Sequence, residues 1–245
     1  MVRLKKITKK KLKEPDEFVS FSEKTFLFIT HHVKPIVKGG IVVLILLLSI
    51  FLYQKWENRN EEEAYRKFNL AVYTYQIVSS PYREGSPSEY KNVLEKLGEV
   101  IAKFPKTSSG KIALLYQGNI HLRLSEFEEA TKSYQTFLQK AGKEKLYRIF
   151  AMEGLGYSYE GKKDYEKALQ SYQKIVAEGE HFQLGDAYLN MGHFQLGDAY
   201  LNMGRCYEKL GKNKEALENY KAFLKVSQKS MMTHAVLRKI SILEN

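Results

Sequence analysis

The sequence is poor in cysteine and in the residues that interrupt helices. Cys206 is the one cysteine among 245 residues, so no disulfide can form within the chain and the redox compartment stays undetermined. Five prolines and 16 glycines are few enough for a mostly helical domain. A hydrophobic composition of 44% suffices to bury a sizeable core, so we expect disorder only at the ends.

Patterns typical of catalysis or metal binding are also missing. The sequence contains no nucleophile elbow and no HExxH motif, and His121 and His234 have no metal-ligand neighbours at a useful spacing. Residues 156–163 approach a phosphate-binding loop, but Lys163 replaces the serine or threonine that would reach magnesium, and no strand precedes them. We therefore expect neither an enzyme nor a bound cofactor or metal.

One long apolar run is present at residues 39–53, with no charged residue and eleven Ile, Val, Leu or Phe side chains. A helix of that length rises about 22 Å, which is short of a bilayer core of roughly 30 Å. Flanking residues that can open the helix, snorkel or sit among headgroups extend it to about 33 Å. These flanking residues are Lys34, Pro35, Lys38, Tyr53 and Trp56.

The run is interpreted as an uncleaved anchor rather than as a signal peptide. No small-x-small cleavage site follows it, and 38 residues precede it. Ten Lys or Arg residues stand up to Lys38, whereas residues 54–73 hold four. By the positive-inside rule the N-terminus is cytoplasmic and the rest of the chain lies across a bacterial inner membrane, in the periplasm.

The net charge of +11 divides between the segments before and after the anchor. The basic run at residues 3–13 is interpreted as a topology determinant that also touches anionic lipid. A contact of this run with the ribosome or with nucleic acid is an alternative, in which the rest of the chain is merely structural. The amphipathic residues 14–34 that follow suit a position at the cytoplasmic interface.

Three segments share one spacing of small and bulky residues, counted from Lys111, Ile149 and Gly197. A small residue on one helix leaves room for a bulky residue on the next, so the spacing predicts stacked pairs of antiparallel helices. The residues 3, 7, 16, 19 and 23 positions after each start are Leu114, Gly118, Phe127, Ala130 and Tyr134; Met152, Gly156, Tyr165, Ala168 and Tyr172; and Tyr200, Gly204, Asn213, Ala216 and Tyr220.

This spacing resembles the tetratricopeptide repeat, which implies an all-α chain: one N-terminal transmembrane helix followed by a right-handed helical-repeat solenoid. Ser125 and Lys163 depart from the family, which often has glycine there. Residues 74–105 look like a degenerate earlier repeat, and residues 230–243 like a closing helix. We expect a cytoplasmic tail at 1–34, an anchor at 35–56, a linking helix and degenerate first repeat at 57–110, and repeats with a capping helix at 111–245.

The resemblance also implies a concave groove that is lined by the first helix of each pair and binds a peptide segment. Relatives that bind cytosolic chaperones use a clamp of two Lys, two Asn and an Arg, of which only Asn119 is matched here, so that partner class is disfavoured. The groove candidates are Leu115, Asn119, Leu122, Arg123, Phe150, Glu153, Tyr157, Leu201, Arg205 and Glu208.

One segment of twelve residues occurs twice in succession, at 181–192 and 193–204, without a difference. The first copy is in phase with the preceding repeats and the second with the following one. Twelve residues add a rotation of about 120° beyond whole turns of helix, so both copies cannot present one face to the same core. We expect one copy to pack while the other projects as a helix extension or an extra turn.

A basic tail, one anchor, a charged helix and tetratricopeptide-like repeats, in that order, resemble the YfgM-like family of ancillary subunits of the SecYEG translocon. The resemblance implies a membrane-tethered scaffold that works beside the translocon and with periplasmic chaperones. The alternative is a scaffold for outer-membrane protein insertion or for cell division. Nucleic acid is disfavoured as a partner, and the acidic residues 14–17 depart from a minimal anchor.

Overall fold

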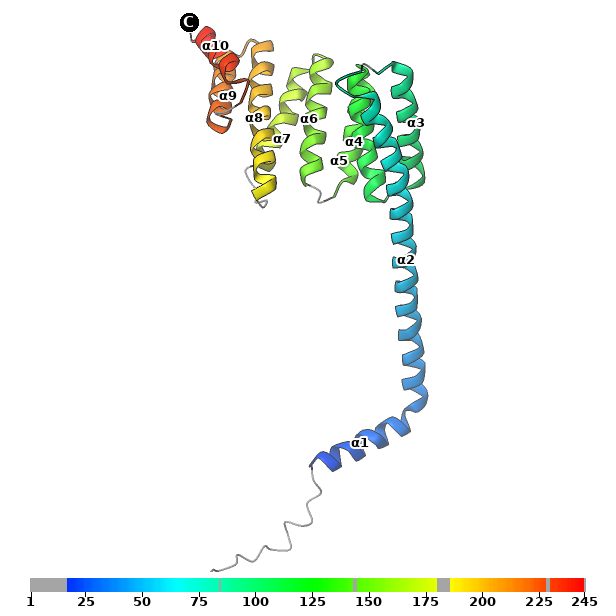
Figure 1. Ribbon diagram of the computed structural model, residues 1–245. Coiled ribbons are helices and arrows are strands. Elements are labelled where there is room, and N and C mark those ends of the chain that lie inside the picture. Colours follow the sequence, from blue (N-terminus) through cyan, green and yellow to red (C-terminus); the bar gives the residue numbers. More distant parts are fainter. Residues whose placement is uncertain (1–16, 84, 143–144, 180–185, 228–229, 245) are drawn as a thin grey trace, which may run out of the picture. The chain divides into compact units, whose positions relative to one another are not determined.

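The computed structural model describes residues 17–83, 85–142, 145–179, 186–227 and 230–244, and for 17–20, 22, 145–146, 179 and 186–195 it describes the backbone alone. Every regular element in these ranges is an α-helix (Figure 1), which confirms the all-α fold. The helices are α1 (Glu17–His31), α2 (Val33–Val78), α3 (Pro87–Lys103), α4 (Ser108–Arg123), α5 (Phe127–Lys140), α6 (Lys145–Gly161), α7 (Tyr165–Gly179), α8 (Asp186–Lys209), α9 (Asn213–Val226) and α10 (Thr233–Leu243).

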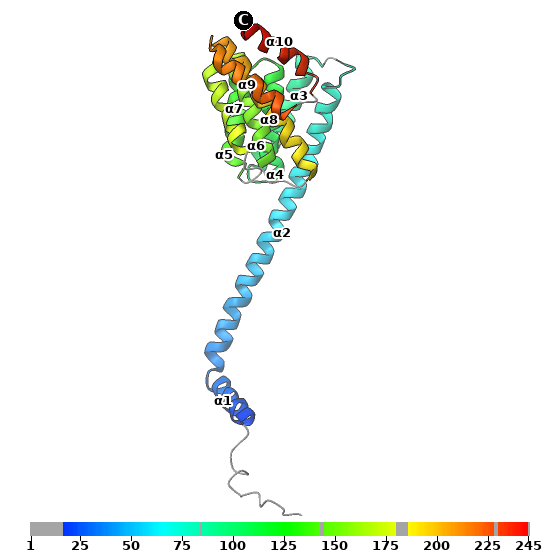
Figure 2. The same cartoon turned by 90° about the vertical axis from the view of Figure 1, so that its left-hand side faces the viewer.

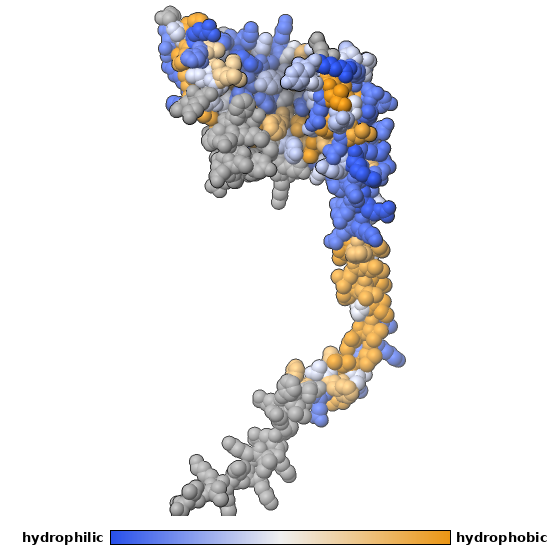
Figure 3. Space-filling model, viewed as in Figure 1, coloured by the Kyte–Doolittle hydropathy of each residue, from blue (hydrophilic) through white to orange (hydrophobic). Residues whose placement is uncertain are grey.

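The chain divides between Asn58 and Arg59 into two compact units. The first unit contains α1 and the apolar part of α2, whose side chains are exposed and form a continuous hydrophobic band (Figure 3). By length and composition, α2 is able to cross a membrane, and no other helix in the described part of the chain meets the same criteria. The sequence therefore placed this apolar helix correctly.

The second unit is a stack of helix pairs (Figure 1), which Figure 2 shows from its α9–α10 end. From α3 to α10 each helix packs on the next one in the chain, and α6 also touches both α4 and α8. The pairs α4–α5, α6–α7 and α8–α9 are the three predicted repeats, and α10 closes the stack against α9 through Val236 and Ile240. This arrangement confirms the helical-repeat solenoid.

The shared spacing has one structural cause, which is a glycine on the first helix of each pair that faces a tyrosine on the second. All three tyrosine side chains are fully buried. A Cβ atom added to the glycine would lie 2.4–2.6 Å from the nearest atom of the tyrosine ring, closer than any ordinary contact. The glycine–tyrosine pairs are Gly118 with Tyr134, Gly156 with Tyr172, and Gly204 with Tyr220.

The turn between the two helices of each repeat has a left-handed residue. Gly211 has a φ of 72°, while Ser125 and Lys163 have φ values of 59° and 61°. In the first turn, the backbone N–H groups of Ser125 and Glu126 donate to carbonyl oxygens in the last turn of α4. The two departures from the family pattern are thus non-glycine residues in a backbone conformation that favours glycine.

The second half of α2 packs as the first helix of the stack. Ala64, Phe68 and Ala71 join a core with buried side chains of α3 and α4. Glu61 caps the N-terminus of α4: its carboxylate accepts hydrogen bonds from the backbone N–H of Ser108 at 2.9 Å and of Ser109 at 3.1 Å. A carboxylate at this position satisfies free N–H groups and complements the helix dipole.

The duplicated segment lengthens α8. This helix has 24 residues, whereas α4 and α6 have 16 and 17. Its second half, from Gly197 onward, is packed, with Ala199, Asn202 and Met203 buried. The first copy contributes backbone to the helix from Asp186, and the packing of its side chains lies outside the described residues.

Candidate functional site

The second unit has a cavity of about 720 Å³ on the side where the first helices of successive pairs meet. Helices α4 and α6 supply ten of its eleven lining residues, and α5 supplies Tyr134. The lining residues are Leu115, Tyr116, Asn119, Leu122, Arg123, Tyr134, Tyr147, Phe150, Glu153, Gly154 and Tyr157. We call this cavity the α4–α6 groove.

Tyr134 forms the floor of the α4–α6 groove. Its ring lies between Gly118 of α4 and Gly154 of α6, where an added Cβ would fall 2.6 Å and 2.3 Å from the ring. Its hydroxyl donates a hydrogen bond of 2.6 Å to Oδ1 of Asn119. Burial raises the pKa of the Tyr134 phenol well above its usual value, so it remains a neutral donor. The groove floor is therefore rigid and polar at one point.

Aromatic side chains from both helices make the walls of the groove. Tyr116 comes from α4, and Tyr147, Phe150 and Tyr157 come from one face of α6. Tyr147 is 37% exposed, so its ring is open to solvent at the rim. Aromatic walls offer large apolar contact areas together with hydroxyl groups, a composition suited to amphipathic peptide side chains.

A guanidinium and a carboxyl group stand at separate places along the groove. Nη1 of Arg123 donates to the hydroxyl of Tyr90 at 2.9 Å, and the guanidinium lies 5.7 Å from the centre of that ring. Glu153 lies on the α6 side. Burial, and secondarily the negative charge of Asp198 on α8, raises the pKa of Glu153 to about 7, against a hydrogen bond of 3.3 Å from the Tyr157 hydroxyl.

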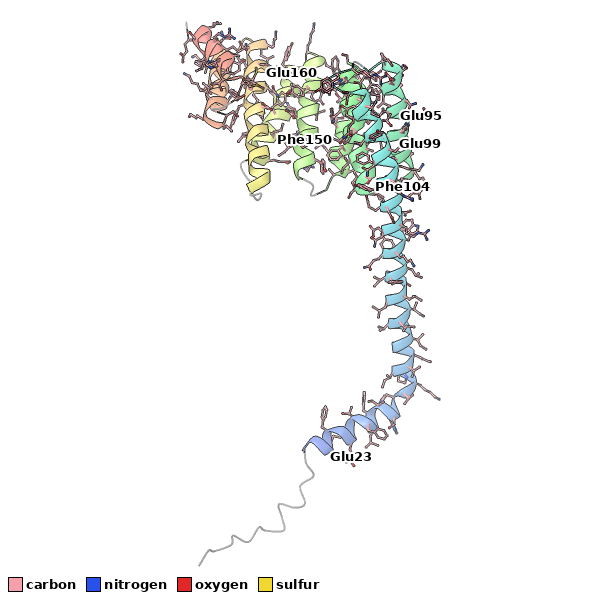
Figure 4. All side chains as sticks on the ribbon, in the orientation of Figure 1. Glu23, Glu95, Glu99, Phe104, Phe150 and Glu160 are labelled. Atoms are coloured by element: carbon pink, nitrogen blue, oxygen red, sulfur yellow. The ribbon has the colours of Figure 1, made fainter. Side chains whose placement is uncertain are left out.

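Polar contacts continue from α6 to α8. Nδ2 of Asn202 donates to the hydroxyl of Tyr157 at 3.1 Å. Nη2 of Arg205 forms an ion pair with both carboxylate oxygens of Glu160, at 2.9 Å and 3.0 Å. Figure 4 places Phe150 and Glu160 toward opposite ends of α6. The two helices are thus held together by side chains along the same face as the groove.

The structure brings seven of the ten groove candidates to one cavity and places three elsewhere. The seven are Leu115, Asn119, Leu122, Arg123, Phe150, Glu153 and Tyr157. Leu201 is 7% exposed and packs in the core formed by α8, α9 and α10, so it offers almost no surface. Arg205 is engaged by Glu160, and Glu208 accepts hydrogen bonds from the Tyr220 hydroxyl and from Nζ of Lys239 at 2.5 Å.

Four lining residues were not among the candidates: Tyr116, Tyr134, Tyr147 and Gly154. The repeat spacing identifies Tyr134 as a packing residue. Because its ring lies between α4 and α6, its hydroxyl also reaches the groove. Tyr147 stands three residues before Phe150, so helical periodicity would have placed both on one face. Within the described residues, no three His, Cys, Asp or Glu side chains come together as a metal site.

Comparison with known proteins identifies the class of the fold. Residues 27–245 match the family described as Tetratricopeptide repeat-like domain. Because this match covers most of the chain, the protein belongs to that family. No curated protein sequence matches it. The fold is that of a protein-interaction scaffold.

Two solved structures agree on the fold, those of RapI and of a tetratricopeptide repeat protein. The apo form of RapI aligns with 74% of this chain and 63% of its own length, with a TM-score of 0.56 and 16% identity. A tetratricopeptide repeat protein from Parabacteroides merdae ATCC 43184 aligns with 73% of this chain and 60% of its own, with a TM-score of 0.54 and 19% identity. MamA aligns with 64% of this chain and 77% of its own length, with a TM-score of 0.49 and 17% identity. This chain thus spans less than two thirds of the first two proteins, and the likeness shows the fold alone.

Proposed function

We propose that this protein is a membrane-tethered scaffold that holds a segment of another protein in the α4–α6 groove. The observation that carries the proposal is the groove itself, where α4 and α6 place aromatic walls, one amide, one guanidinium and one partly buried carboxyl group around about 720 Å³. A cavity of this size takes a few side chains of a peptide rather than a whole domain. Extended and helical segments both present side chains at the spacing of such a groove.

Membrane tethering is supported by the exposed apolar part of α2 and by the charges around it. Ten basic residues up to Lys38, against four in residues 54–73, favour a cytoplasmic N-terminus. The protein would then stand in a bacterial inner membrane with its repeats in the periplasm. Tethering confines the groove to the membrane surface and raises its effective concentration for clients there.

The order of tail, anchor, charged helix and repeats supports a role like that of the YfgM-like family. In that role the partners are SecYEG, periplasmic chaperones and the secreted or envelope proteins that emerge from the translocon. The alternative is an envelope-assembly scaffold, whose partners are stable proteins of outer-membrane insertion or cell division. Neither role requires catalysis or a cofactor.

Photo-crosslinking from the groove in the native host tests the proposal. A benzoyl-phenylalanine is placed at Tyr147, on the groove rim, and in a matched protein at Tyr159, which is also on α6 but faces α5 and α7. The captured proteins are identified by mass spectrometry. We expect specific products from position 147 and not from position 159.

The identity of the captured proteins separates the two roles. Translocon subunits, a periplasmic chaperone or nascent secretory chains support the translocon role. Capture only of outer-membrane or division proteins supports the alternative. Equal capture at positions 147 and 159 would contradict a role for the groove itself.

Protease accessibility tests the orientation separately. Protease added outside spheroplasts should digest the repeats and leave the N-terminal tail intact, whereas the same protease added to inverted vesicles should remove only the tail. The reverse pattern would place the repeats in the cytoplasm.

A further inference from the structure

The apolar side chains of the first helix, α1, are exposed, and the ring of Phe28 stacks on that of His32 with the ring centres 4.5 Å apart. Phe21, Phe28, Ile29 and Phe26 are all exposed. At about 100° per residue they lie, together with Ser22 and Thr25, within an arc of about 160° on one side of the helix. The opposite side carries Glu23, Lys24, Thr30 and His31, with Leu27 as the one apolar residue among them.

Two threonine hydroxyls of α1 form hydrogen bonds with the backbone of the helix itself. The hydroxyl of Thr25 donates to the carbonyl oxygen of Phe21 at 2.8 Å, and that of Thr30 to the carbonyl oxygen of Phe26 at 2.9 Å. A hydroxyl with a hydrogen-bond partner costs much less to remove from water than a free one. The Thr25 hydroxyl, which lies within the arc, is therefore compatible with an apolar surrounding.

The sequence before and after α1 indicates what covers the apolar arc. Only His32 separates α1 from α2, whose apolar part lies in the same unit of the structure (Figure 3). A helix so close to a membrane anchor cannot leave the surface of that membrane. At its other end the sequence has the acidic residues Glu14, Asp16 and Glu17 and, before them, seven basic residues at positions 3–13, which complement anionic headgroups.

We propose that α1 is a lipid-binding helix that lies in the headgroup region of the monolayer entered by α2, with Phe21, Phe28 and Ile29 inserted among anionic lipids. This inference rests on the membrane anchoring proposed above and is independent of the groove. Lys24 lies near the edge of the apolar arc, where its ammonium group reaches phosphate while its stem covers apolar surface. The pair of anchors fixes the N-terminal end of the protein at two points in one membrane.

Spin-label accessibility tests the proposal on the full chain in vesicles of equal parts phosphatidylcholine and phosphatidylglycerol. Cys206 is first replaced by serine, and single cysteines at positions 21–31 are then labelled in turn. We expect the ratio of oxygen to nickel-chelate accessibility to oscillate with the helical period, highest at 21, 25, 28 and 29 and lowest at 23, 24 and 31. Uniform exposure to the nickel chelate would overturn the proposal.

A matched pair of variants tests whether the apolar arc of α1, rather than its polar side, faces the lipid. Phe28→Asp changes a side chain that is 61% exposed on the apolar arc, and Leu27→Asp changes one that is 63% exposed on the polar side. With the label at position 25, Phe28→Asp should raise nickel-chelate accessibility several-fold and Leu27→Asp should leave it unchanged. Equal effects of the two variants would contradict an oriented helix.

Two further readouts distinguish insertion of α1 into lipid from two other outcomes. In one, a second copy of the protein covers the apolar arc, and in the other, α2 does not span the membrane. Spin–spin broadening between labelled copies, abolished by dilution with unlabelled protein, would show that a second copy covers the arc and would overturn the lipid assignment. Extraction of the protein by alkaline carbonate would show that the anchor itself fails. An inserted anchor with a water-exposed α1 refutes the inference alone.

Discussion

The close approach of Tyr134 to two glycines predicts that one methyl group at Gly154 destabilises the repeats and deforms the groove. A Cβ at Gly154 would lie 2.3 Å from Cζ of Tyr134, whereas carbon atoms in contact prefer about 3.5–4.0 Å. The ring cannot retreat, because Gly118 of α4 lies against the same ring. Overpacking of this kind costs up to about 3 kcal/mol, and the better helix propensity of alanine returns about 1 kcal/mol. Gly154→Ala should therefore lower the free energy of unfolding by about 2 kcal/mol.

Gly98 in α3 provides the matched control. A Cβ added there meets nothing within 4 Å, so Gly98→Ala keeps only the gain in helix propensity. We expect this variant to be about 0.5–1 kcal/mol more stable than the parent. The same Gly→Ala substitution should thus lower the free energy of unfolding at position 154 and raise it at position 98.

Urea unfolding of the full chain in a mild detergent, followed by circular dichroism at the helix band, measures both variants. Adding Tyr134→Leu to Gly154→Ala removes the clashing ring, so the double variant should lose less than the sum of the single losses, by about 1 kcal/mol or more. Additive losses, or a Gly154→Ala protein as stable as the parent, would refute the proposed packing of Tyr134.

Further predictions concern the cap, the turns and the groove carboxylate. Glu61→Ala should lower the free energy of unfolding by about 1–2 kcal/mol through the lost cap on α4, whereas Glu62→Ala on the exposed side of α2 should change it by less than about 0.5 kcal/mol, both by urea unfolding. Ser125→Gly and Lys163→Gly should each raise the free energy of unfolding by about 0.5–1 kcal/mol, because glycine adopts the left-handed conformation of these positions without strain. Gly211→Ser should lower it by a similar amount, and thermal unfolding measures the sign of each change. Glu153 has a folded-state pKa of about 7, above its ordinary value of 4.5, so the folded state holds its proton more tightly. Stability should therefore fall as pH rises from about 4.5 to about 7, and a Glu153→Gln protein should lack this fall in a pH series of unfolding curves. A parent and a Glu153→Gln protein with parallel pH profiles would contradict the burial of this carboxylate.

Much of the fold could be predicted from the sequence because one physical constraint repeats. A buried tyrosine opposite a glycine leaves a fixed spacing, and three copies of it define three helix pairs. The apolar part of α2 was equally clear, since a long run of uncharged side chains has few structural meanings. Both signals are local in the sequence and do not depend on distant contacts.

The groove was less predictable because it depends on which residues of a helix remain uncovered. Leu201 occupies a groove position by count, but α9 and α10 pack over it and bury it. Conversely, Tyr134 counts as a core residue, yet Gly154 on the next repeat opens a path for its hydroxyl to the cavity. These outcomes follow from contacts between repeats, which the spacing within one repeat does not specify.

The central claim is that the α4–α6 groove is the surface that binds other proteins. Fluorine NMR of the full chain in lipid nanodiscs tests it most directly, with trifluoromethyl-phenylalanine at position 147 in one sample and at position 159 in the other. The added probe is a pool of twelve-residue peptides tiled from secreted envelope proteins. We expect a saturable shift of the resonance at position 147, with the resonance at 159 unchanged. A shift at 159 alone, or no shift at 147 at any peptide concentration, would contradict it.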